Sequence, residues 1–232
     1  MSPVSDVVKS KRSQQQADAR RDRWREHRAQ RRADFVEAAV NAIEAHGVDV
    51  GMDEIASEAG VTKPVLYRHF SDKAELYLAV SQWGTELLLR RLIPAINEEL
   101  APMLRIRTAL DAFFGLIEEH PNVYRFISRR QIAGTGVDSD PVAEDKELIA
   151  ATIARLLGDY MRALDMDSGA AEPWAYGLVG LVQNTGEWWL ARQSMSRDAV
   201  VEYVAKLIWL AIDGVLRDSG VAIDPSQPFE VN

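Results

Sequence analysis

The chain has 232 residues, of which 47% are hydrophobic and 27% charged, as expected of a globular protein with one or two domains. It contains no cysteine, which excludes disulfides, cysteine-ligated metal sites and thiol catalysis. The formal net charge is −8, no run of 18 apolar residues occurs, and the N-terminus lacks the apolar core of a signal peptide. We therefore expect a soluble, cytoplasmic protein without a membrane partner.

The charge is unevenly distributed. Residues 9–32 contain ten Lys or Arg and three Asp or Glu, whereas the chain from Ala33 onward contains 17 basic and 31 acidic residues. Phosphate binding depends on the local field and not on the net charge. Residues 1–24 are polar and lack hydrophobic periodicity, which predicts a flexible basic arm. Such an arm is compatible with DNA contacts and equally with a solvated tail.

The first long helix is predicted over residues 25–46, where apolar residues recur at helical spacing from Phe35 to Ile43 and Gly47 provides the stop. Residues 51–70 then predict two short helices joined by a tight turn at Gly60. Thr62 is the expected N-cap of the second short helix, and Pro64 falls in its first turn.

The second short helix is predicted over residues 63–69. Val65, Leu66 and Phe70 are expected to be buried, and the outward side chains are Lys63, Tyr67, Arg68 and His69. A basic and aromatic outward face favours a helix-turn-helix, whose second helix enters the DNA major groove, over an ordinary helical hairpin.

At these positions the sequence resembles the tetracycline-repressor (TetR) family. The resemblance rests on Ile55-Ala56, Ala59-Gly60-Val61-Thr62, Leu66-Tyr67, His69-Phe70 and Lys73, within about residues 31–80. It departs from the family at Gly51, where many members place a Ser or Thr cap. The resemblance implies a dimeric, ligand-responsive DNA-binding regulator, more often a repressor, that binds a palindromic operator. The DNA-contacting residues that it and the outward face predict are Thr62, Lys63, Pro64, Tyr67, Arg68, His69 and Lys73.

The rest of the chain predicts further helices, so the fold class is all-α: a three-helix helix-turn-helix domain plus a larger helical ligand-binding and dimerisation domain. The fourth helix is expected to start at Asp72 with Ser71 as its cap, and to break or kink at Pro94. The later helices are predicted near residues 103–120, 121–132, 142–165, 170–193 and 197–218, with a loop at 134–141. The predicted domains are residues 1–24, 25–72, 73–218 and a loosely ordered tail at 219–232.

The last two helices are apolar on most sides, and such helices must be covered on most sides. The family resemblance implies that they form the homodimer interface as a four-helix bundle. Internal core in a single protomer is the alternative.

Aromatic residues are frequent in the larger domain, and apolar pockets with a few polar groups are typical small-molecule sites. A core role explains many of these aromatics equally well. We expect a small apolar or amphipathic effector, with fatty acyl-CoA among the ligand classes that the family resemblance implies. The predicted ligand-binding residues are Phe114, Tyr124, Phe126, Arg129, Trp174, Gln183 and Trp188.

No catalytic or cofactor motif stands out in the sequence. Glu118, Glu119 and His120 are adjacent on one predicted helix and so do not face one another, which argues against a metal site. We expect no cofactor, no metal and no enzymatic activity. The alternatives are an enzyme, or a non-DNA helical interaction module, that uses the aromatic pocket.

Overall fold

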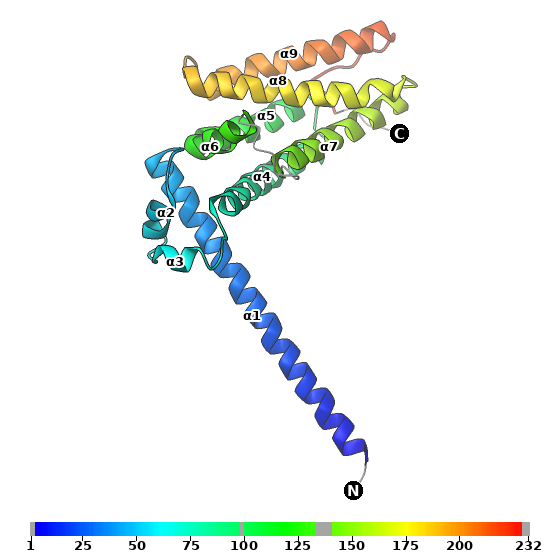
Figure 1. Ribbon diagram of the computed structural model, residues 1–232. Coiled ribbons are helices and arrows are strands. Elements are labelled where there is room, and N and C mark those ends of the chain that lie inside the picture. Colours follow the sequence, from blue (N-terminus) through cyan, green and yellow to red (C-terminus); the bar gives the residue numbers. More distant parts are fainter. Residues whose placement is uncertain (1–2, 98–99, 133–140, 229–232) are drawn as a thin grey trace. The chain divides into compact units, whose positions relative to one another are not determined.

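The computed structural model describes residues 3–97, 100–132 and 141–228, and these ranges contain helices but no strand (Figure 1). This confirms the predicted all-α fold class. The helices are α1 (Pro3–His46), α2 (Met52–Glu58), α3 (Lys63–Leu66), α4 (Lys73–Asn97), α5 (Pro102–Glu119), α6 (Pro121–Ile132), α7 (Pro141–Ala163), the 3-10 helix η1 (Ser168–Ala170), α8 (Ala171–Arg192) and α9 (Arg197–Asp218). The chain divides into two compact units, Met1–Tyr77 and Leu78–Asn232.

The first unit is built around the C-terminal part of α1. Apolar side chains at helical spacing on α1 pack against α2 and the segment that follows it, and Ala39, Ile43, Leu66 and Phe70 have no exposed surface. A face with this spacing is buried because it removes a continuous apolar stripe from water. The three helices of the predicted helix-turn-helix domain are therefore present.

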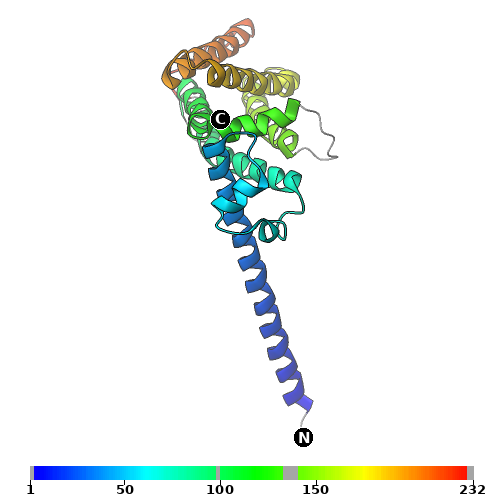
Figure 2. The same cartoon turned by 60° about the vertical axis from the view of Figure 1, so that its left-hand side comes forward.

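The predicted start of the first helix is wrong. The helix begins at Pro3 and not near Arg25, and both views show it extending well beyond α2 and α3 (Figures 1 and 2). Residues 4–46 contain no Gly or Pro and are rich in Arg, Gln, Ala and Glu, which all have high helix propensity. Hydrophobic periodicity reports the burial of a helix face, so it gives no signal where a helix is polar on all sides.

The fourth helix also differs from the prediction at both ends. Asp72, and not Ser71, caps α4, because its carboxylate accepts the N–H of Glu75 at 2.8 Å while the Glu75 carboxylate accepts the N–H of Ser71 at 2.7 Å. Pro94 lies inside α4, which continues to Asn97. Arg90 and Pro94 are both exposed, so water can hydrate the carbonyl that Pro94 leaves without a helical partner.

The core of the second unit forms where α5 packs against α8 and α9. Leu110, Phe114, Ile117, Trp189 and Val200 belong to one buried cluster. Gly186 of α8 permits this packing, because a Cβ atom there would lie 2.8 Å from Cε1 of Phe113. A larger residue would push the two helices apart.

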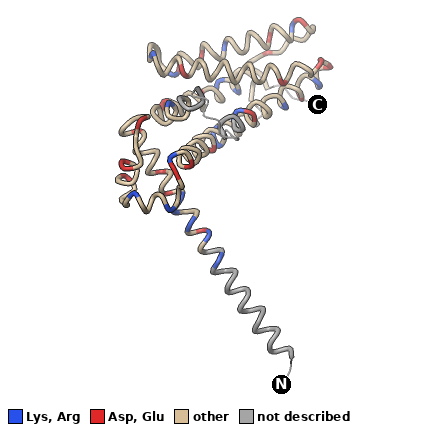
Figure 3. The backbone as a smooth tube through the Cα atoms, viewed as in Figure 1, with Lys and Arg blue, Asp and Glu red and all other residues tan. Residues whose placement is uncertain are grey.

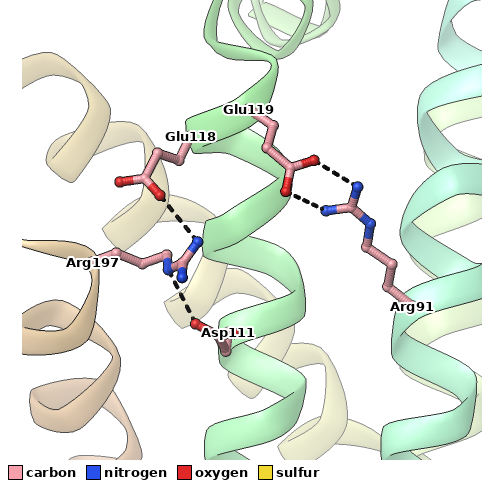
Figure 4. Close-up of polar contacts among 5 residues, drawn as sticks. All are labelled: Arg91, Asp111, Glu118, Glu119 and Arg197. Atoms are coloured by element: carbon pink, nitrogen blue, oxygen red, sulfur yellow. Dashed lines mark hydrogen bonds and ion pairs between the residues drawn. The ribbon is translucent and has the colours of Figure 1, made fainter.

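Ion pairs join α5 to its neighbours on two sides. Figure 4 shows Glu118 and Glu119 pointing in different directions, toward Arg197 of α9 and Arg91 of α4. Arg91 binds Glu119 with two hydrogen bonds of 3.1 and 2.6 Å, and Arg197 also lies 3.1 Å from Asp111. Arg91 is the main reason why the pKa of Glu119 is lowered.

The remaining helix boundaries agree closely with the sequence. Helices α6 and α9 have the predicted ends, and α5, α7 and α8 differ by at most two residues at either end. The predicted loop at 134–141 lies outside the described residues, except that Pro141 opens α7. The described part of the tail makes a contact that was not predicted, since the carbonyl of Pro225 accepts the N–H of Met103 at 3.1 Å.

Candidate DNA interface and effector cavity

The turn between α2 and α3 is held by backbone geometry. Gly60 has a φ of +63°, a left-handed conformation that favours glycine, and the N–H of Val61 bonds to the carbonyl of Ala56 at 2.9 Å. At the start of α2, the Glu54 carboxylate accepts the N–H of Gly51 at 3.0 Å. This hydrogen bond satisfies the N–H of Gly51 itself, as in one half of a capping box, whereas Gly51 has no side chain to accept an N–H of the first turn as a Ser or Thr cap would.

The candidate recognition helix is shorter than predicted. Regular α-helix ends at Leu66, and residues 67–69 form a turn in which Arg68 and His69 donate backbone bonds to residues three positions earlier, at 3.2 and 2.9 Å. The tighter turn carries Phe70 into the core, where its side chain has no exposed surface. Thr62 occupies the predicted N-cap position, but its hydroxyl accepts no capping bond.

The structure places most of the predicted DNA-contacting side chains at the surface of this segment. Exposed residues are Thr62, Lys63, Pro64, Tyr67 and Arg68. Lys63 pairs with Asp53 of α2 at 2.9 Å, so this acid raises the pKa of Lys63 and holds its side chain. Lys73 is half-buried and donates to the carbonyl of Val50 at 2.8 Å.

His69 is half-buried and not outward as predicted. Its ring packs edge-on against Phe35 of α1 with the centroids 4.9 Å apart. Burial, followed by the positive charges of Arg28, Arg31, Arg32 and Arg68, lowers the pKa of His69. The neutral imidazole is therefore part of the packing behind the exposed segment.

Arg32 is a structurally important residue that the predicted site omits. Its guanidinium donates to the carbonyl of His69 at 2.6 Å, lies 4.3 Å from the centre of the Phe70 ring, and pairs with Glu75 at 2.9 Å. It thereby ties α1 to the start of α4 and to the end of residues 63–69, which we call the recognition segment. Its position one turn before Phe35 and Val36, on the buried face of α1, is the signal that could have identified it.

The described part of α1 carries a dense group of cations next to this segment. Figure 3 shows the Lys and Arg residues gathered on α1 before it reaches α2 and α3. Six arginines and two acidic residues lie between positions 21 and 32. A field of this sign attracts the phosphates of nucleic acids.

A cavity of about 100 Å³ lies in the second unit among α4, α5, α6, α7 and α8. Its walls are mainly apolar, and the polar side chains among them come from several helices. The lining residues are Trp83, Gly84, Thr85, Leu88, Phe113, Leu116, Ile117, His120, Val123, Tyr124, Ile127, Ser128, Lys146, Ile149, Gln183 and Glu187. Sites for drug-sized ligands are typically about 300–1,000 Å³, so a ligand of that size requires the surrounding helices to separate.

Two polar groups of the cavity are in unusual environments. Burial raises the pKa of Tyr124 to about 12, and the charge of Glu187 acts in the same direction, so the phenol stays protonated. The Nδ1 atom of His120 is buried and has no hydrogen-bond partner among the residues that the structure describes, and its ring lies edge-on to Trp83 at 5.2 Å. Both groups can therefore form hydrogen bonds with a polar atom placed in the cavity.

Among the predicted ligand-binding residues whose side chains the structure describes, two, Tyr124 and Gln183, lie in the cavity wall. Phe114 is fully buried in the core against Trp189, and Phe126 is half-buried outside the lining. Trp174 and Trp188 do not line it either, since both are exposed on α8. The side chain of Arg129 lies outside the described residues. Aromatic composition does not show which side of a helix faces a cavity.

The outer face of α8 and α9 exposes large apolar side chains. On α9, Tyr203, Leu207 and Leu210 are 65, 54 and 55% exposed and share one helix face, and Trp174 and Trp188 are exposed on α8. Large apolar side chains that are exposed together on one helix face, as on α9, are typical of a protein interaction site.

Within the described residues, no group of three or more His, Cys, Asp or Glu side chains is arranged to hold a metal ion. The helices described for this chain also include none with the length and apolar character needed to cross a membrane.

Two family profiles match the chain. The profile of "Bacterial regulatory proteins, tetR family" matches residues 35–80, and that of "Tetracyclin repressor-like, C-terminal domain" matches residues 91–221. The first match contains α2, α3 and the exposed segment, and the second contains the cavity residues beyond Leu88 and the outer face of α8 and α9.

Curated relatives and solved structures agree with this match. An uncharacterised helix-turn-helix-type transcriptional regulator of Mycobacterium tuberculosis is 34% identical over 204 residues, covering 88% of this chain and 86% of the relative. The helix-turn-helix-type transcriptional activator FasR of Mycolicibacterium smegmatis is 30% identical over 211 residues, covering 90% of this chain and 95% of FasR. A TetR-like transcriptional regulator from Rhodococcus sp. RHA1 superposes with a TM-score of 0.60 at 26% identity, covering 79% of this chain and 96% of that structure. With both of its units matched in this way, the chain belongs to the TetR family of bacterial regulatory proteins.

Proposed function

We propose that this protein is a ligand-responsive transcriptional regulator that binds a palindromic operator as a homodimer. The observation that carries the proposal is the exposed cationic and aromatic segment at Lys63, Tyr67 and Arg68, which the buried side chains of Leu66 and Phe70 hold in place. A short helix anchored in this way fits the major groove of B-form DNA. The proposed DNA-binding domain is residues 25–72, and residues 73–218 form the ligand-binding and dimerisation domain.

Within this interface, Lys63 and Arg68 are the proposed readers of base edges, because cationic side chains pair with the guanine acceptors in the major groove. The proposed phosphate contacts are Tyr67 and Thr62, and Pro64 is proposed to touch the DNA surface. Lys73 and His69 belong to the same proposed site, but their half-buried side chains give them mainly a supporting role.

The interface is tested by measuring operator affinity. Wild-type protein is used to select duplexes from a random-sequence pool, and the binding of Arg68→Ala to the selected duplex is measured by fluorescence anisotropy. Loss of one bidentate contact is worth about 1–3 kcal/mol, or roughly a 5- to 150-fold weaker Kd for each protomer. Arg155→Ala, on an exposed part of α7, serves as the control. Equal affinities of Arg68→Ala and the wild type would remove Arg68 from the interface.

The effector is proposed to bind the cavity between α4 and α8. The apolar walls suit a small apolar or amphipathic molecule, with fatty acyl-CoA as one class to test, and Tyr124 and Gln183 would bind its polar part. A ligand acts by preferring one of two protein conformations, and its effect on DNA affinity equals that preference. We expect Tyr124→Phe to weaken effector binding about 2- to 10-fold, as for a lost hydrogen bond.

Thermal-shift screening with acyl-CoAs and free fatty acids of increasing chain length tests this part of the proposal. The matched control is Trp174→Phe, because Trp174 lies outside the cavity wall and this substitution should leave ligand stabilisation unchanged. If the ligand-induced rise in melting temperature is lost equally in Tyr124→Phe and Trp174→Phe, the ligand binds elsewhere.

Repression is the proposed direction of control, and activation is the second candidate because the relative FasR is named an activator. A reporter gene behind the selected operator distinguishes them: deletion of the regulator raises expression if it represses and lowers it if it activates. We assign the cavity to binding without catalysis. The proposed place of action is the cytoplasm, where chromosomal DNA is accessible.

A further inference from the structure

We propose that an arginine stripe on α1, defined as Arg21, Arg25 and Arg28, is a second DNA-binding surface that contacts the phosphates of the duplex flanking each operator half-site. The inference rests on the proposed function, and it extends the DNA-binding surface beyond the recognition segment. Of the two alternatives for the predicted arm, it adopts the DNA contact over the solvated tail for the part of α1 around Arg21.

The three arginines lie on one face of a helix. Their spacing, together with Arg32, is four, three and four residues, and positions three and four apart are neighbours on a helix surface. Arg21 and Arg28 are exposed. Glu26 lies on a different side of the helix, since each residue is rotated by about 100° from the one before it.

Arg32 shows which side of α1 this face occupies. Its guanidinium contacts the carbonyl of His69 at 2.6 Å and lies 4.3 Å from the centre of the Phe70 ring. Because the stripe continues the row that starts at Arg32, it follows the side of α1 that faces the end of the recognition segment. A duplex bound by that segment is therefore approached by the stripe as well.

The positive charge of α1 is continuous with that of the recognition segment. The cations that lower the pKa of His69 come both from α1, at Arg28, Arg31 and Arg32, and from Arg68. The two groups are therefore close enough in space to act on one imidazole. Arg32 itself is paired with Glu75, so the field of α1 that a polyanion bound at Arg68 meets comes from the other arginines of the helix.

The distance along α1 from Arg32 indicates that the stripe contacts DNA beside the half-site and not the half-site itself. At 1.5 Å per residue, Arg21 lies about 16 Å beyond Arg32 along the helix, and Pro3 lies about 44 Å beyond it. One turn of B-form DNA is about 34 Å long, and the stripe from Arg21 to Arg28 is about 10 Å long, so it spans about a third of a turn of duplex. Contacts at this distance from α3 fall on the phosphates of flanking DNA, which bind cations regardless of base sequence.

The test compares the salt dependence of binding on two duplexes. One duplex ends at the edges of the selected palindrome, and the other continues for about one helical turn on each side. The full chain is compared with the triple variant R21Q/R25Q/R28Q, because Gln has a helix propensity similar to that of Arg and keeps α1 helical. The charge-matched control is R90Q/R155Q/R192Q, three exposed positions in the second unit.

On the long duplex we expect the slope of log K against log salt concentration to become shallower by about 0.9 for each lost phosphate contact, or nearly 3 per protomer. On the short duplex the triple variant should bind as the wild type does, and the control variant should match the wild type on both. If the slope of the triple variant on the long duplex equals that of the wild type, the proposal is overturned. This holds even if the substitutions change the self-association of the protein. An equal loss on both duplexes overturns the assignment to flanking DNA. A wild-type protein that selects no duplex contradicts the proposed function itself.

Discussion

Arg32 combines three contacts in one side chain and so links three parts of the first unit. It binds a backbone carbonyl, an aromatic ring and a carboxylate that belong to separate parts of the chain. Loss of the guanidinium leaves the His69 carbonyl without this donor and the Glu75 carboxylate without its counter-ion. Each of these losses is individually modest.

We therefore expect Arg32→Ala to lower the free energy of unfolding by about 1–3 kcal/mol, as measured by urea denaturation. Arg31→Ala is the matched control, because Arg31 is an exposed neighbour on the same helix and should change stability by less than about 0.5 kcal/mol. Similar values for the two variants would show that the contacts of Arg32 contribute no net stability.

His69 predicts a pH dependence of stability. Its pKa in the folded protein lies below the ordinary value of 6.5, so the unfolded chain binds a proton more readily than the folded one. Stability from this group is fully present above pH 6.5 and decreases as the pH falls from 6.5 through the lower folded pKa. This pH dependence is measured by urea denaturation of the wild type and of His69→Gln at a series of pH values.

The His69→Gln variant should lose this part of the pH dependence, whereas His46→Gln, at the exposed end of α1, should keep it. If the free energy of unfolding of both variants depends on pH as it does in the wild type, groups other than His69 account for this pH dependence.

At this scale the sequence predicts exposure better than contacts. Lys63, Tyr67 and Arg68 are outward as expected, because the buried Leu66 and Phe70 on either side of the turn fix which side chains face water. The contact of Arg32 with residue 69 spans 37 positions, so local periodicity carries no information about it. The cavity wall, for the same reason, could be predicted only at Tyr124 and Gln183.

At the scale of helices, predictions succeeded where a residue type fixes the end. Pro121 opens α6, and Ser196, whose hydroxyl accepts the N–H of Ala199 at 3.3 Å, caps α9. They failed for α1, whose polar half has no apolar face to detect, and for α3, where a tighter turn replaces the last helical residues.

The outer face of α8 and α9 contains helical glycines that the protomer itself does not require. A Cβ atom at Gly177, Gly180 or Gly214 would meet nothing within 4 Å. Glycine in a helix costs about 1 kcal/mol relative to alanine, so an isolated protomer would be more stable with alanine at all three. Close approach of a second copy accounts for both the glycines and the exposed Tyr203, Leu207 and Leu210.

We accordingly expect the double substitution Leu207→Glu and Leu210→Glu to convert the dimer into a monomer, as measured by analytical ultracentrifugation. The added carboxylates would have to be buried without partners in the interface, which is strongly unfavourable. Leu148→Glu is the control because Leu148 is similarly exposed, at 51%, but belongs to α7 and not to α8 or α9. A double variant that remains dimeric would place the interface elsewhere.

At the scale of the whole molecule, function depends on two copies that read one site. The recognition segments of a dimer bind half-sites one helical turn apart, so the spacing of the half-sites is part of the specificity. Inserting five base pairs at the centre of the selected operator turns one half-site to the opposite side of the duplex. We expect roughly a hundredfold weaker binding by gel shift, because only one half-site remains in contact.

An insertion that leaves affinity unchanged would mean that each protomer binds on its own. The acidic remainder of the chain favours the specific mode, since negative charge away from the basic region repels the duplex from other surfaces.

The glycines on α8 and α9 have a consequence for cells that contain several related regulators. A surface with glycine notches accepts only a partner whose ridges fit them, and a paralogue with bulky side chains at the corresponding places would collide with them or leave voids. Mixed pairs would read two unlike half-sites and act on the wrong genes. We therefore expect the shape of this face to disfavour mixed pairs, and alanine at Gly177 and Gly180 to increase the exchange of subunits with such a paralogue relative to self-pairing.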